Sequence, residues 1–172
     1  MQRTTRRGID WLAAAADEPE KCKAVWADDP RRPCVLPTGE HFDAVVLDER
    51  VGLETFDQLD RRRLPLGPVM VDHASRQVGF LLPAKSEQRF ARMLPEDAGN
   101  GCLAYKYLGI GGNIVVPGPI ALSGDRYEWL RAPVGHSDWS PARTAALAAM
   151  FVAAHSLIVR ADQYGRELSG GC

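Results

Sequence analysis

The 172-residue sequence has no excess of positive charge, since its formal net charge is −1 at pH 7. Proteins that bind nucleic acid over a large surface usually carry a clear basic excess, because every phosphate they contact is negatively charged. We therefore expect any such contact to come from a local patch rather than from the whole surface. The candidate patches are Arg3 with Arg6 and Arg7, Arg31 with Arg32, and the run Arg61, Arg62 and Arg63.

Cysteine is also scarce, with single residues at positions 22, 34, 102 and 172 and no Cys-x-x-Cys pair. This spacing argues against a structural zinc site and against the disulfide framework of a small secreted protein.

Long hydrophobic runs are missing as well. No apolar run follows the N-terminal arginines, so no signal peptide is expected. The most apolar segment begins at Ala145 and ends at Val159, which is too short for a membrane span, and His155 and Ser156 interrupt it. We expect a cytoplasmic protein without membrane contact.

The composition that remains is ordinary for a globular protein, with 45% apolar and 25% charged residues. We expect one domain over residues 1–172, with flexible ends at 1–8 and 165–172. Hydrophobic periodicity predicts an α+β fold, in which helices flank a mixed or mostly antiparallel central sheet. Strands are predicted at residues 42–47, 69–71, 78–82, 103–107, 113–116 and 127–130, and a short extended run at 33–36.

Four helices are predicted around these strands. The first follows a capping pattern of Asp17 and Glu20 and ends before Pro30. The second covers residues 53–63, with Leu53, Phe56 and Leu59 facing inward, and the third covers residues 86–94. The last begins after Ser140, extends to about residue 160, and is apolar almost all round. Such a helix is buried across a sheet or completes its burial against another copy of the chain.

Asp48 and Glu49 follow the apolar strand at 42–47, at the end where active sites of sheet proteins gather. Two carboxylates there can share a hard divalent cation, so both residues are candidate catalytic groups and Asp48 is a candidate metal ligand. Adjacent strand residues point to opposite faces, however, so the two carboxylates can meet only if the chain bends between them. Otherwise one residue caps a turn and the other is solvated.

A glycine-rich segment at residues 109–113 precedes the predicted strand at 113–116. Gly111 and Gly112 would let the backbone approach a phosphate or a base closely. A tight hairpin turn explains the same glycines without any ligand. The segment matches neither a Walker loop nor a Rossmann fingerprint, because no Gly-Lys-Ser/Thr and no helix follow it.

The four histidines are isolated in the sequence. His155 on the apolar helix is most simply a core residue. His73 lies in a polar loop between two predicted strands, beside Asp72 and Ser75, and is a candidate ligand contact.

Several short segments follow one another along the chain in a characteristic order. They are Trp11 with the segment AAADEPE at 14–20, VWADDP at 25–30, VLPTG at 35–39, VVLD at 45–48, GIGGNIVVPGP at 109–119 and YEW at 127–129. In this order and spacing they resemble the bacterial bifunctional DNA primase/polymerase N-terminal domain over about residues 10–133. The resemblance implies a primase/polymerase-like fold, with nucleotide contacts near Thr38, Gly39, Gly111 and Gly112.

The same resemblance implies a depleted catalytic site. Family members use three acids and a histidine around divalent metals, and only Asp48 matches the first acid. The position of the second acid holds Arg50, with Glu49 one place out of register. The histidine position falls near Val78 or Gly79, and the third acid falls among Lys106, Tyr107 and Leu108.

Three functions are compatible with these patterns. The first is a non-catalytic, regulatory primase/polymerase-like domain that binds a nucleotide, nucleic acid or protein, with Lys106 and Arg61 to Arg63 as phosphate contacts. Alternatively, those arginines only form the solvated C-terminal end of the predicted helix at 53–63 and bind nothing. The second is an active primase/polymerase with a rearranged Mg²⁺ or Mn²⁺ site that uses Asp48, Glu49 and another acid such as Asp72; no cofactor is expected otherwise. The third is a module that binds a protein partner or forms a homodimer through the helix at 145–159.

Overall fold

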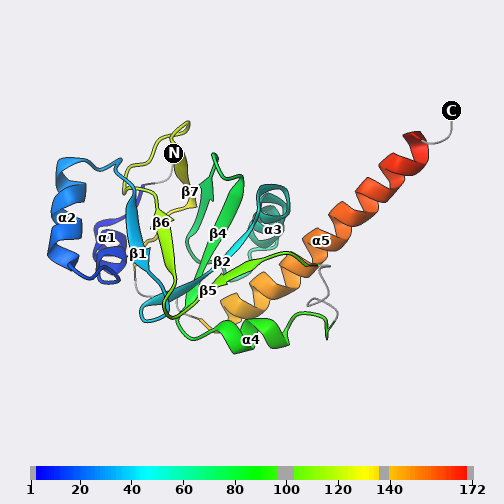
Figure 1. Cartoon of the computed structure of the whole chain (residues 1–172), viewed down its shortest axis with the longest axis horizontal. Helices are drawn as coiled ribbons and strands as arrows, with labels where there is room; N and C mark the ends of the chain where they lie inside the picture. The colour runs from blue at the N-terminus through cyan, green and yellow to red at the C-terminus, as the bar shows by residue number, and fades with distance from the viewer. Residues whose placement is uncertain (1–2, 97–102, 136–139, 170–172) are drawn as a thin grey trace.

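The computed structural model describes residues 3–96, 103–135 and 140–169. It has the predicted α+β fold, in which every strand pair within these residues is antiparallel (Figure 1). The elements, in chain order, are α1 (Arg6–Ala13), α2 (Pro19–Asp28), β1 (Cys34–Pro37), β2 (Phe42–Asp48), α3 (Glu49–Arg61), β3 (Val69–Asp72), β4 (Gln77–Pro83), α4 (Glu87–Arg92), β5 (Lys106–Leu108), β6 (Asn113–Val116), β7 (Tyr127–Arg131) and α5 (Ala142–Ser169).

The strands form two sheets. A five-stranded sheet has the order β5-β2-β4-β3-β7, and a separate two-stranded sheet pairs β1 with β6. The prediction that residues 42–47 form an interior strand is confirmed, because β2 is paired on both sides. The prediction of an edge strand at 127–130 is also confirmed, since β7 pairs only with β3 among the described residues.

Side-chain alternation along β2 supplies two hydrophobic cores, one on each face of the large sheet. Ala44 packs toward α1, α2 and the small sheet, a side that we call the β6 face. Val45 and Leu47 point the other way, where they meet Leu59 of α3 and Phe151 of α5. We call this side the α3 face. Figure 1 shows the same division, with the small sheet, α1 and α2 at one side of the large sheet and α3 and α5 at the other.

Helix α3 begins four residues earlier than predicted, directly after β2. Asp48 is its N-cap, because its carboxylate accepts a hydrogen bond from the Arg50 backbone N–H at 3.0 Å. The buried residues of the helix are Gly52, Thr55 and Leu59, so the prediction that Leu59 faces inward is confirmed. The prediction for Leu53 is wrong, because this residue is 40% exposed.

Two other local predictions are corrected. Asp17 does not cap α2, whose N-cap is Glu18 and has no side-chain capping bond. The glycine-rich segment is not a hairpin turn within one sheet, because β5 pairs with β2 and β6 pairs with β1. It is the passage from one sheet to the other. Helix α1 was not predicted and includes residues 6–8 of the segment expected to be flexible.

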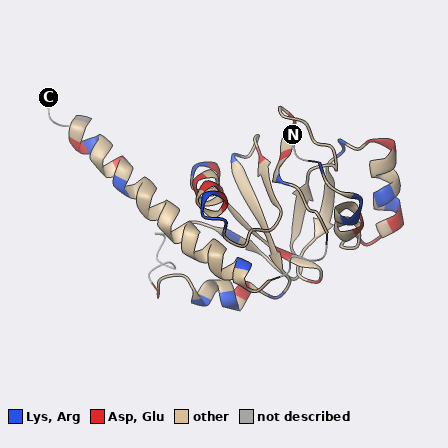
Figure 2. Ribbon diagram, turned by 180° about the vertical axis from the view of Figure 1, so that it is seen from behind, with Lys and Arg blue, Asp and Glu red and all other residues tan. Residues whose placement is uncertain are grey.

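The C-terminal helix α5 extends to Ser169, past the predicted end near residue 160. Its first half packs against α3 and α4, Asp162 in its second half still pairs with Arg50 of α3, and its C-terminal turns project away from the rest of the chain (Figures 1 and 2). Its length and apolar composition also satisfy the requirements of a membrane span, which is a weak indication because core helices of soluble proteins satisfy them too.

Candidate functional site

The register of the large sheet places a row of polar side chains on the β6 face, at the end where β2 stops. Asp48 pairs with Gln77, Gln77 with Asp72, and Asp72 with Tyr127. Directly cross-strand residues share a face, so these four side chains lie on one side of the sheet. In the next row Lys106 pairs with Val46, which brings a lysine to the same face.

A pocket of about 160 Å³ lies over these two rows, between the large sheet and β6. Gly79 leaves room at its floor, because a Cβ added there would stand 3.3 Å from Met70 Cγ and 3.4 Å from Ile114 Cδ1. The polar lining residues are Asp72, Gln77, Lys106, Asn113 and Tyr127. Asp48 is the direct cross-strand partner of the lining residue Gln77 but is not itself part of the lining.

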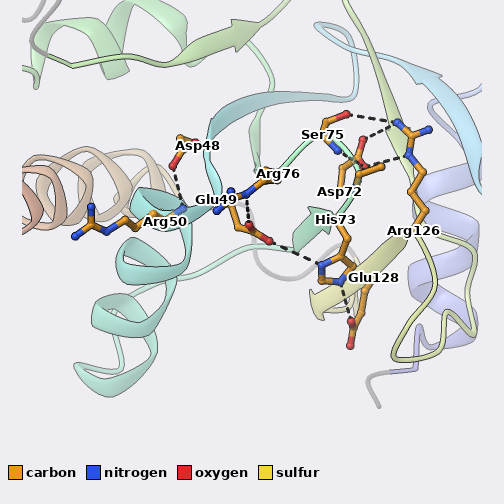
Figure 3. A network of polar contacts seen from close by, with 10 residues as sticks. Asp48, Glu49, Arg50, Asp72, His73, Ser75, Arg76, Arg126 and Glu128 are labelled. Atoms are coloured by element: carbon orange, nitrogen blue, oxygen red, sulfur yellow. Dashed lines mark hydrogen bonds and ion pairs between the residues drawn. The ribbon is translucent and has the colours of Figure 1, made fainter.

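The carboxylate of Asp72 is fully engaged by its own surroundings. Arg126 donates to both of its oxygens at 3.1 Å, and the backbone N–H groups of Ala74 and Ser75 donate at 3.0 and 3.1 Å (Figure 3). Burial raises the pKa of this carboxyl, but the hydrogen bonds from Arg126 and Ser75 outweigh it and lower the pKa to about 2. Asp72 is therefore a paired anion inside the pocket.

Glu49 points away from the pocket, although for a different reason than strand alternation. The residue is the first of α3, and its carboxylate accepts from Arg76 Nε at 3.1 Å and lies 3.9 Å from His73 Nδ1. His73 Nε2 in turn lies 3.2 Å from Glu128 Oε2, on the α3 face (Figure 3). The chain does bend after Asp48, but the bend separates the two acids instead of joining them.

These acids do not fit the pair of divalent ions that the primase/polymerase resemblance implies. One ion needs carboxylate oxygens that converge on it, and two such ions stand about 3.5–4 Å apart. Asp48 and Asp72 stand two strands apart, roughly 10 Å between Cα atoms. Within residues 3–96, 103–135 and 140–169, no three His, Cys, Asp or Glu side chains are grouped closely enough to hold a metal ion.

Lys106 is the free charge of the pocket. Its ammonium group has no hydrogen-bond or ion-pair partner in the part of the chain that the structure describes. The amides of Gln77 and Asn113 likewise have no side-chain hydrogen bond to another described residue. Tyr127 also lines a second pocket, which contains Arg31, Arg32 and Arg126 together with Asp29 and Asp125. Arg31 is paired there with Asp125. The Arg126 guanidinium stacks on the Tyr127 ring, 4.8 Å from its centroid.

The other residues singled out in the sequence lie elsewhere. Thr38, Gly111 and Gly112 line a separate pocket of about 360 Å³, which shares only Asn113 with the first. Thr38 Oγ1 donates to the Gly109 carbonyl at 2.7 Å, and a Cβ added at Gly112 would stand 2.6 Å from that hydroxyl. These residues therefore join the β1 loop to the turn before β6.

The arginine run at 61–63 lines neither the pocket that contains Lys106 nor the pocket that contains Thr38. This corrects its grouping with Lys106. Arg61 ends α3 and pairs with Asp57, about 18 Å along the helix axis from Glu49. Gln77, Asn113, Arg126 and Tyr127 were not among the predicted site residues, although Asn113 and Tyr127 lie in the segments at 109–119 and 127–129 that carry the family resemblance. Their grouping depends on strand register.

The fold and the site thus define the class of protein: an α+β domain with a cation-bearing pocket between two antiparallel sheets. A family model for the bifunctional DNA primase/polymerase N-terminal domain matches residues 3–147, which include the seven strands of the described residues. The chain belongs to this family. Comparison with curated proteins gave no significant match, and comparison with solved structures gave none either.

Proposed function

We propose that this chain is a non-catalytic primase/polymerase-like domain that binds a phosphate-bearing ligand, either a nucleotide or a nucleic-acid strand. The ligand would bind in the pocket of about 160 Å³ that Lys106 lines. The single observation behind the proposal is that Lys106 lines this pocket without an anionic partner, while Asp72 is already paired with Arg126. A free ammonium beside two free amides, those of Gln77 and Asn113, suits a phosphate oxygen.

The size of the pocket limits what enters it. About 160 Å³ is well below the roughly 300–1,000 Å³ of pockets that enclose a whole small ligand. We expect a phosphate group with its sugar to enter, and the remainder to lie outside. Tyr127 offers a stacking surface for the next nucleotide of a strand, and Arg32 of the second pocket offers a further cation, whereas Arg31 there is already paired with Asp125.

Lack of catalysis is supported by the separation of the acids. Phosphoryl transfer by metals needs several carboxylates with free oxygens at one point. Here Asp48 caps α3, Glu49 pairs with Arg76, and Asp72 pairs with Arg126.

The test compares Lys106→Ala with the matched variant Lys21→Ala, which removes the same charge from the exposed surface of α2. Isothermal titration with a nucleoside triphosphate and anisotropy with a labelled single-stranded oligonucleotide distinguish the two ligand types. We expect Lys106→Ala to weaken binding by roughly ten-fold or more, since a charge-assisted hydrogen bond contributes about 1.5–3 kcal/mol. Lys21→Ala should bind as the parent chain does.

A primer-extension assay with Mg²⁺ or Mn²⁺ tests the absence of catalysis. We expect no extension. Extension that Asp48→Ala abolishes would instead establish an active polymerase with a rearranged metal site. Equal binding by the Lys106→Ala and parent chains would refute the pocket assignment.

A further inference from the structure

The second half of α5 exposes large apolar side chains. Leu157 is 51% exposed, Tyr164 67% and Leu168 83%, and every side chain from 161 to 168 is exposed. Single exposed apolar residues are normal on a protein surface, but an aligned set on one helix marks a contact surface.

These residues are aligned. Leu157, Ala161, Tyr164 and Leu168 follow one another at spacings of four, three and four, which places them on one face of a helix. We call them the Leu157–Leu168 stripe. The opposite side of α5 is identified by Asp162, which pairs with Arg50 of α3 at 2.8 and 3.0 Å. The stripe lies about 130° around the helix axis from Asp162, so it faces away from α3.

We propose that the Leu157–Leu168 stripe binds the same stripe of a second copy of this chain, with the two helices antiparallel. A two-fold axis between residues 162 and 163 brings Leu157 against Leu168 of the second copy. The same axis brings the small Ala161 against the large Tyr164 of the second copy. The stripe is therefore complementary to itself in shape, as a symmetric dimer contact requires.

Charge fits the same arrangement. Arg160 and Glu167 flank one edge of the stripe. In the antiparallel register Arg160 lies diagonally opposite Glu167 of the second copy, within reach of a long side chain, and symmetry repeats this pair. A parallel register would leave Arg160 facing Gly165 and would place both domain bodies at the same end. The antiparallel register places the bodies at opposite ends.

The contact is small. The stripe extends over about 17 Å of a single helix. A surface of this length buries far less area than the roughly 800 Å² per partner of a standard interface. We expect a dimer that dissociates on dilution, with a dissociation constant on the order of micromolar.

Sedimentation of the whole chain over a range of concentrations tests the proposal. We expect a concentration-dependent dimer that Leu157→Glu converts to a monomer. The matched control is Val159→Glu, because Val159 is also exposed on α5 but lies roughly opposite the stripe. This control should dimerise as the parent chain does. Circular dichroism checks that both variants stay folded.

The charge pairs give the sharper test of orientation. Arg160→Glu alone and Glu167→Arg alone should each raise the dissociation constant by about five-fold, since two exposed pairs become repulsive. The double variant should restore the parent value. Failure of the double variant to restore it would refute the antiparallel register. A parent chain that is monomeric at all concentrations, or that associates through vesicles of anionic lipid instead, would overturn the proposal.

Discussion

The ion pair between Arg126 and Asp72 decides whether the pocket carries a free acid, and Arg126→Ala tests it. Asp72 is largely buried, with 14% of its side chain exposed, whereas Arg126 is 54% exposed. The substitution removes two hydrogen bonds to the carboxylate and leaves those from the backbone of Ala74 and Ser75.

The structure sets the size of the effect. Lowering the pKa of Asp72 from 3.8 to about 2 stabilises the folded state by about 2 kcal/mol at pH 7, since one pKa unit corresponds to about 1.4 kcal/mol. Arg126 supplies part of this and is half-exposed to solvent. We therefore expect Arg126→Ala to lower the free energy of unfolding by about 1 kcal/mol.

The sign of the pH dependence follows from the direction of the shift. A carboxyl with a lowered pKa stabilises the fold above its ordinary pKa of 3.8, and the stabilisation is lost as the pH falls from 3.8 to about 2. The difference between the parent chain and Arg126→Ala should therefore be constant near neutral pH and shrink below pH 4. The stacking of Arg126 on Tyr127 does not depend on pH in this range. Any difference in the free energy of unfolding that remains at pH 2 therefore measures the loss of that contact.

Urea unfolding, followed by tryptophan fluorescence at pH 7 and at several values below 4, measures this difference. Asp72→Asn is the matched control, because it removes the charge but keeps the size of the side chain. Once Asp72 is Asn, the further change Arg126→Ala should cost little. A difference between the parent chain and Arg126→Ala that does not change with pH would refute the assignment of Asp72 as a paired anion.

Three further predictions concern packing. Tyr107→Phe should cost about 1–3 kcal/mol in urea unfolding, because the hydroxyl donates at 2.6 Å to the buried Asp43 carboxylate. Gly39→Ala should lower the melting temperature more than Gly124→Ala: both residues have positive φ, but only at Gly39 would a Cβ stand 2.4 Å from backbone atoms. Burial raises the pKa of Cys22 to about 12, so iodoacetamide at pH 8 should alkylate it much more slowly in the folded chain than in urea, as peptide mass spectrometry will show.

Local signals in the sequence predicted most elements of the fold. The apolar run before Asp48 predicted an interior strand, and Ser140 predicted the start of α5, where its hydroxyl accepts from the Ala142 N–H at 3.2 Å. The start of α3 was missed because Asp48 both ends a strand and caps a helix. One residue with two local roles is ambiguous to a periodicity argument.

The sequence by itself determined the family and the fold class, because ordered motifs and side-chain periodicity are properties of neighbouring residues. Only the tertiary structure decided which charges are free. Asp72 meets Arg126 across 54 positions, and Glu49 meets Arg76 across 27. Lys106 lies in the pocket because β5 pairs with β2 in one particular register. Ion pairs between distant residues depend on strand register, and strand register results from the packing of the whole domain.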